Sequence, residues 1–249
     1  MKLDTGWQQA LLAQIHTVAA ADPRVIAVQA FGSVASGEAD AWSDLDVTLR
    51  VVAGAATAIA SPRWLAQFGQ VWAVDASANS ARCVVRAVYA DGRRLDVSVA
   101  DAGRTPVATP PALDRLAART TRVRFAAALA VEKAARNDLL IASHLTLGVL
   151  RDCLEVALLL RDRTHRTSHH RFGGPGNDVS ARAVALLAGG ADPASLYRAI
   201  EGAVALYDGL AGTLQAAHVP DRSGLDALLD RARADLTRNA GRCVAAPTT

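Results

Sequence analysis

Two aspartates and a Gly-Ser pair have the residue types and the spacing of a site for phosphate and a metal ion. An apolar run over residues 25–31 predicts a strand that leads into Gly32 and Ser33, and after a gap of ten residues another apolar run opens with Asp44 and Asp46. Side chains two positions apart on a strand lie on one face. Two adjacent carboxylates are costly unless a cation lies between them, and oxygen ligands favour Mg²⁺ over zinc.

A third carboxylate strengthens this interpretation. Asp96 lies in the alternating run RRLDVSVAD, which follows the hairpin signal Asp91-Gly92. An Asp-x-Asp pair alone is also typical of a charged strand face or a plain turn. Asp96 on a neighbouring strand favours a shared metal site instead.

The segment ADPRVIAVQAFGSVASGEADAWSDLDV resembles the nucleotidyltransferase superfamily. The signature of that superfamily is an apolar residue, Gly-Ser, a gap of roughly ten residues and then acid-apolar-acid. The resemblance is closest to the small bacterial enzymes that adenylylate aminoglycoside or lincosamide antibiotics. It is clear over the first hundred residues and extends to the rest of the chain in architecture.

This resemblance implies roles for the matching residues. Asp44 and Asp46 would ligate Mg²⁺, and Ser33 with the Gly32 and Ser33 backbone N–H groups would hold the β- and γ-phosphates of ATP. Gly32 would be needed because a Cβ would block the approach of backbone to phosphate. Asp96 would ligate a second ion or serve as the general base.

Two residues of the C-terminal half are further candidates. Glu155 belongs to a polar stripe on a predicted helix (His144, Arg151, Glu155 and Asp162), which faces either solvent or an internal cleft. In the cleft, Glu155 would compete with Asp96 for the role of base. Lys133 is a rare lysine in an arginine-rich chain, and it is either a phosphate contact or a surface lysine paired with a neighbour.

Hydrophobic periodicity predicts an α+β fold in two parts, residues 1–108 and residues 109–249. The resemblance implies that the first part is a nucleotidyltransferase domain and the second a helical substrate-binding domain. The first would hold a mixed sheet with flanking helices, and the second a helical bundle. Expected strands are 25–31, 45–52, 71–75, 82–90 and 93–100. Expected helices are 6–21, a short one from Ser33, 61–68, 112–135, 138–163, 178–189, 193–214 and 222–238.

Composition narrows the class of protein. Of 249 residues, 51% are hydrophobic and 20% are charged, and no run approaches the roughly 20 apolar residues of a membrane span. The first residues lack the apolar stretch of a signal peptide, and three scattered cysteines suit a reducing compartment, so a cytoplasmic location is expected. A net charge of +3 without a Lys/Arg tract predicts neither a nucleic-acid nor a membrane partner.

The expected function is Mg²⁺-dependent transfer of a nucleoside monophosphate, AMP from ATP, to a hydroxyl of a small molecule. An antibiotic of lincosamide or aminoglycoside type is the expected acceptor, with the basic composition slightly favouring a less charged one. The alternatives are adenylylation of a protein or RNA, as in toxin–antitoxin systems, and an inactive nucleotide-binding module. The His- and Arg-rich loop 164–178 is a further candidate for contact with phosphate or acceptor.

Overall fold

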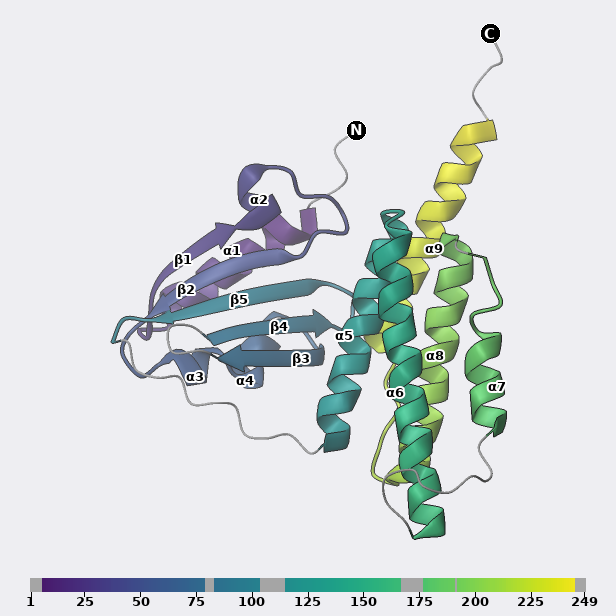
Figure 1. Cartoon of the computed structure of the whole chain (residues 1–249). Helices are drawn as coiled ribbons and strands as arrows, with labels where there is room; N and C mark the ends of the chain where they lie inside the picture. The colour runs from purple at the N-terminus through teal and green to yellow at the C-terminus, as the bar shows by residue number, and fades with distance from the viewer. Residues whose placement is uncertain (1–5, 79–82, 104–114, 167–176, 191, 245–249) are drawn as a thin grey trace. The chain divides into compact units, whose positions relative to one another are not determined.

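The structure is a computed structural model that describes residues 6–78, 83–103, 115–166, 177–190 and 192–244 (Figure 1). The chain divides into two compact units, residues 1–113 and 114–249, and each unit is described by itself. The boundary predicted from the sequence, between residues 108 and 109, lies in a segment outside the described residues.

Unit 1 is a five-stranded mixed sheet with helices (Figure 1). The strand order is β1-β2-β5-β4-β3, in which β2 and β5 are parallel and the other neighbours are antiparallel. The strands are β1 (Val25–Phe31), β2 (Leu45–Val51), β3 (Val71–Ala78), β4 (Cys83–Tyr89) and β5 (Arg94–Asp101). The helices are α1 (Gly6–Ala21), α2 (Gly32–Ser36), α3 (Ala56–Ile59), α4 (Pro62–Leu65) and a 3₁₀ turn, Ala66–Phe68.

The core of unit 1 lies on one face of this sheet. Alternate residues of β2, β4 and β5 are buried there, and they pack with apolar side chains of α1, α3 and α4. Because successive side chains of a strand point to opposite faces, the intervening residues of β2 and β5 lie on the other face, which carries the polar side chains.

A tight hairpin fixes the register between β4 and β5. The N–H of Tyr89 donates to the carbonyl of Arg93 at 2.9 Å, and the N–H of Gly92 donates back to the carbonyl of Tyr89 at 2.9 Å. Gly92 takes φ +78°, a left-handed conformation that glycine adopts without strain. The predicted Asp91-Gly92 turn is thus present, and its geometry places Arg86 opposite Asp96.

Unit 2 is a helical bundle. Its helices are α5 (Arg115–Ala135), α6 (Leu139–His165), α7 (Asn177–Ala185), α8 (Pro193–Leu214) and α9 (Ser223–Val244). Helix α5 packs against α6, α8 and α9, and α7 packs against α6 (Figure 1). Buried alanines, valines and leucines line these contacts. On α6 the buried positions include Ala142, Thr146, Val149, Cys153 and Val156, whereas Leu140 is 82% exposed.

The α+β class, the mixed sheet and the helical C-terminal half are confirmed. The helices predicted at 6–21 and 193–214 have those bounds. The helix predicted at 61–68 is instead α4 followed by a 3₁₀ turn, with Ser61 as the N-cap that accepts from Trp64 N–H at 3.3 Å. The helix predicted at 178–189 ends at Ala185, and the one predicted at 222–238 continues to Val244.

Two further findings concern the helices and the cysteines. Among the described helices, none has both the length and the apolar character that crossing a lipid bilayer requires. Cys83 and Cys153 are buried, and each is a free thiol.

Candidate active site

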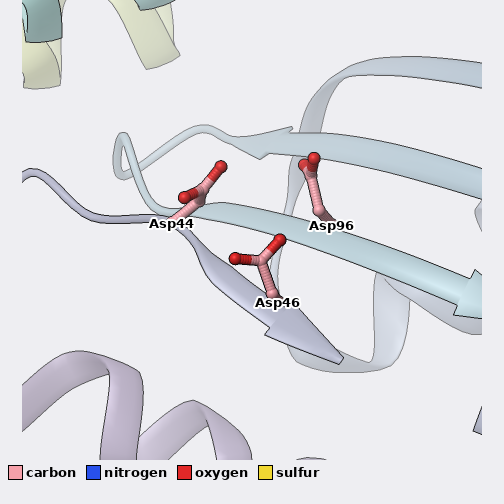
Figure 2. A group of neighbouring side chains, drawn as sticks. All are labelled: Asp44, Asp46 and Asp96. Atoms are coloured by element: carbon pink, nitrogen blue, oxygen red, sulfur yellow. The ribbon is translucent and has the colours of Figure 1, made fainter. Parts of the chain in front are cut away.

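Three aspartates gather on the face of the sheet opposite the core. Asp46 and Asp96 each lie between buried apolar residues of their strand, so both side chains point away from the core, on the opposite face of the sheet. The parallel register of β2 and β5 pairs these two residues directly, and Asp44 precedes Asp46 by two positions. Figure 2 shows the three carboxyl groups together, and one oxygen from each belongs to a set whose members all lie within 4.8 Å of one another.

Burial and the neighbouring negative charges raise the pKa of two of these carboxyl groups. Burial raises the pKa of Asp46 to about 6, with the charges of Asp44 and Asp96 adding to the rise. Burial also raises the pKa of Asp96, assisted by the charge of Asp44. Both effects disfavour the ionised forms in the absence of a cation.

Two arginines contact the aspartates. The Nη2 of Arg94 lies 3.1 Å from Oδ2 of Asp44, and the Nε of Arg86 lies 3.2 Å from Oδ2 of Asp96. Three carboxylates against two guanidinium groups leave a negative excess. The protein therefore offsets part of the repulsion itself and keeps a site that attracts a cation.

Gly32 brings the backbone close to Asp46. It begins α2 with φ +64°, and a Cβ added there would lie 2.4 Å from Oδ2 of Asp46. Sequence reasoning expected a Cβ to obstruct phosphate, whereas the nearest obstacle in the structure is the Asp46 carboxylate. Ser33 follows in the first turn of α2, and its carbonyl accepts from the N–H of Glu38 at 2.9 Å.

These residues fit a hard divalent cation. All three ligands offer carboxylate oxygens, which Mg²⁺ prefers. The Oδ1 atom of Asp96 is buried and has no hydrogen-bond partner among the described residues. A buried oxygen of this kind is costly unless something binds it, and a cation held by the three carboxylates would do so.

The sequence of unit 1 matches a known family. Residues 7–112 match the sequence model of a family described as streptomycin adenylyltransferase. That segment includes Gly32, Ser33 and all three aspartates. The chain is an antibiotic-nucleotidyltransferase-like enzyme.

A solved structure is similar to this nucleotidyltransferase over most of its length. An aminoglycoside 6-adenyltransferase from Bacillus subtilis aligns with 92% of this chain and 98% of its own, at 11% identity and a TM-score of 0.35. A likeness this distant carries no argument about the chain. No curated protein sequence matches the nucleotidyltransferase.

Glu155 lies in a charged cluster within unit 2 of the nucleotidyltransferase. Its carboxylate contacts the guanidinium of Arg119 and lies 3.6 Å from Nε of Arg151. The neighbouring Asp152 is buried and accepts from Arg119 at 2.9 Å and from Arg122 at 2.6 Å. The carboxylate of Glu155 is therefore already paired with arginines, and the role of Glu155 as a base stays a prediction.

The polar stripe predicted on this helix does not share one environment. His144 and Arg151 are exposed, Glu155 is half-buried and Asp162 is buried, because the buried face of α6 includes Asp152 and Asp162 as well as apolar residues. The stripe is thus neither wholly on the solvent side nor wholly within a cleft.

Lys133 lies in the last turn of α5, where its Nζ is 3.7 Å from Oδ2 of Asp138. This pairing is the alternative that the sequence left open, and a phosphate contact stays a prediction. Arg163 lies in the last turn of α6, just before the predicted loop 164–178, and it donates to the carbonyls of Leu214 and Thr213 at 2.7 and 2.8 Å, at the C-terminal end of α8. His169, His170 and Arg171 lie outside the described residues.

Sequence reasoning missed the arginine partners of the aspartates. Arg94 could have been found, because it precedes Asp96 by two positions on one strand and so shares its face. Arg86 could be placed only with the register of the β4–β5 hairpin, which the sequence signal does not specify to one residue.

Proposed function

We propose that this enzyme transfers AMP from ATP to a hydroxyl group of a small-molecule antibiotic, in a reaction that requires Mg²⁺. The observation that supports the proposal is the convergence of Asp44, Asp46 and Asp96 beside Gly32 and Ser33, inside the segment that matches the streptomycin adenylyltransferase family. Streptomycin is an aminoglycoside, so the family favours an aminoglycoside over a lincosamide acceptor.

The three aspartates would hold the metal ion. When bound, Mg²⁺ neutralises charge on the triphosphate and lowers the pKa of a hydroxyl that it contacts. Gly32 and Ser33 would bind the β- and γ-phosphates through backbone N–H groups. Helix α2 starts after Phe31, and no side chain of the described residues caps it there. Its first N–H groups are therefore available to phosphate oxygens.

The transfer forms one bond and breaks one. The acceptor oxygen attacks the α-phosphorus, the bond from that phosphorus to the oxygen bridging to the β-phosphate breaks, and pyrophosphate leaves. If Asp96 does not bind an ion, it would accept the hydroxyl proton, since its Oδ1 is buried without a hydrogen-bond partner among the described residues and its pKa is raised. Glu155 is the second candidate for the base, but two arginines already contact its carboxylate.

A product assay tests this function. The purified protein is incubated with Mg²⁺, ATP labelled at the α-phosphate and a panel of aminoglycosides and lincosamides. We expect label in an aminoglycoside product with release of pyrophosphate. Label only on protein or RNA would favour the alternative acceptor class, and an absence of transfer to every acceptor would favour an inactive nucleotide-binding module.

A further inference from the structure

In unit 1, charged side chains form one row across the face of the sheet opposite the core. The strand register pairs Asp75 on β3 with Arg86 on β4, Arg86 with Asp96 on β5, and Asp96 with Asp46 on β2. The row therefore contains two of the three clustered aspartates, and it continues beyond them to an arginine and a further acid. Neither Arg86 nor Asp75 has a role in the function proposed above.

Arg86 bridges the acids on either side of it. Its Nε lies 3.2 Å from Oδ2 of Asp96, and its Nη1 lies 3.5 Å from Oδ2 of Asp75. A guanidinium group is planar and rigid, so contacts at two of its nitrogens fix its orientation as well as its position. Asp75 is 53% exposed in its side chain and Arg86 is 45% exposed, so this pair adds little to the stability of the fold.

The contact with Arg86 gives the two carboxylate oxygens of Asp96 different environments. Oδ2 is held by the guanidinium, whereas Oδ1 is buried and has no hydrogen-bond partner among the described residues. Oδ1 is therefore the oxygen that keeps all of its acceptor capacity for a ligand shared with Asp44 and Asp46. A carboxylate free to rotate would offer either oxygen, but one fixed through Oδ2 offers the same atom each time.

We propose that Arg86 is a positioning residue, which holds Asp96 so that Oδ1 is available to the metal ion shared with Asp44 and Asp46, and that Asp75 holds Arg86 in place. This inference rests on the proposed function of the three aspartates. It assigns to Arg86 no contact with the substrate. It differs from a simple counter-ion role, in which only the positive charge of Arg86 would matter.

Arg86→Lys separates position from charge, because lysine keeps the charge but cannot bridge two acids with a planar fork. Mn²⁺ binding to the nucleotide-free protein, followed by electron paramagnetic resonance, gives a readout that does not depend on turnover. We expect Arg86→Lys to weaken Mn²⁺ binding and to lower kcat, each by roughly 10-fold or more, with the KM for ATP nearly unchanged. Asp75→Asn should lower the same two quantities by a smaller factor.

Arg50→Lys is the matched control. Arg50 lies on β2 four positions after Asp46, it is exposed, and it makes no ion pair with a described residue. This variant should behave as the wild type. Circular dichroism of each variant verifies that the fold is retained.

Other outcomes would overturn the inference. Wild-type Mn²⁺ binding and kcat in Arg86→Lys, together with tighter Mn²⁺ binding in Arg86→Ala, would show a simple counter-ion. A raised KM for ATP with unchanged Mn²⁺ binding would show a phosphate contact. Asp46→Asn tests the underlying metal site separately. If this variant binds Mn²⁺ as the wild type does, the metal site proposed above is wrong. If Asp46→Asn loses Mn²⁺ binding while Arg86→Lys keeps wild-type Mn²⁺ binding and kcat, only the positioning role is refuted.

Discussion

Asp46 and Asp96 face each other as paired residues of the parallel strands β2 and β5. Their separation is set by the hydrogen bonds of the sheet and by the buried residues on either side of them, rather than by a mobile loop. The geometry needed to share a cation is therefore built into the backbone. This relationship makes the site testable with substitutions that preserve shape.

Asp46→Asn and Asp96→Asn should each abolish most of the activity while the protein stays folded. Each substitution keeps the size of the side chain but removes a negative charge from the proposed metal site. We expect kcat to fall by roughly 100-fold or more. The measurement is pyrophosphate release with saturating ATP and acceptor. Asp22→Asn, at the opposite end of β1 from Gly32, is the control, and activity near wild type in either site variant would contradict the site.

The pKa of Asp46 predicts how pH affects the metal-free protein. The pKa of this carboxyl is about 6 in the folded state against 3.8 for an ordinary Asp, so the folded state binds the proton more tightly. The contribution of the protonated Asp46 carboxyl to the free energy of unfolding is fully present below about pH 4, and it is lost as the pH rises through about 6. Stability in the presence of a chelator should therefore fall over this range.

Asp46→Asn should remove that dependence. At pH 7.5 in EDTA the variant should be more stable than the wild type, by on the order of 1 kcal/mol after allowance for solvent screening at this half-buried group. Thermal unfolding at several pH values measures the difference. Added Mg²⁺ should stabilise the wild type more than the variant, and equal stabilisation of both would show that Asp46 does not bind the ion.

Two glycines allow backbone strain to be separated from a clash at the site. Gly32 and Gly37 both take left-handed conformations, with φ +64° and +74°, but a Cβ on Gly37 would meet nothing within 4 Å. Gly32→Ala and Gly37→Ala should each cost roughly 1–2 kcal/mol of stability. Only Gly32→Ala should also lower kcat severely, because its Cβ would displace the Asp46 carboxylate. Equal kinetic effects would mean that the close approach at Gly32 has no functional importance.

The charged cluster of unit 2 should separate stability from catalysis. Asp152 is buried and contacts two arginines, so Asp152→Asn should destabilise the protein by about 3 kcal/mol. Glu155 is 42% exposed, and Glu155→Gln should cost about 1 kcal/mol or less and leave kcat close to wild type. Urea unfolding and steady-state kinetics measure the two effects. A large loss of kcat in Glu155→Gln at unchanged stability would instead identify Glu155 as the base.

Sequence patterns predicted most of the fold because the long elements have clear periods. The predicted bounds of helix α1 and strand β1 match the observed ones, since Asp22-Pro23 ends the helix and the Gly32-Ser33 turn ends the strand. Helix α3 was missed because four alanine-rich residues give no period to detect. The second half of the helix predicted at 61–68 is a 3₁₀ turn, which propensity does not distinguish from an α-helix.

The site was predictable as a set of residues but not as a network of contacts. The three aspartates and Gly32 could be named from their spacing, whereas the partner of Asp96 depends on whether the hairpin loop holds two residues or three. The observed loop holds three, Ala90 to Gly92. A loop one residue shorter would put Arg86 out of register with Asp96. The sequence signal Asp91-Gly92 is compatible with both lengths.

The two faces of the sheet have consequences for how such an enzyme diversifies. Residues that stabilise unit 1 and residues that surround the aspartates alternate along the same strands, yet they touch different neighbours. Substitutions at one set of alternate positions can alter the surroundings of the aspartates while the packing of the core stays the same. A sheet with this design can change its site without having to find a new way to fold.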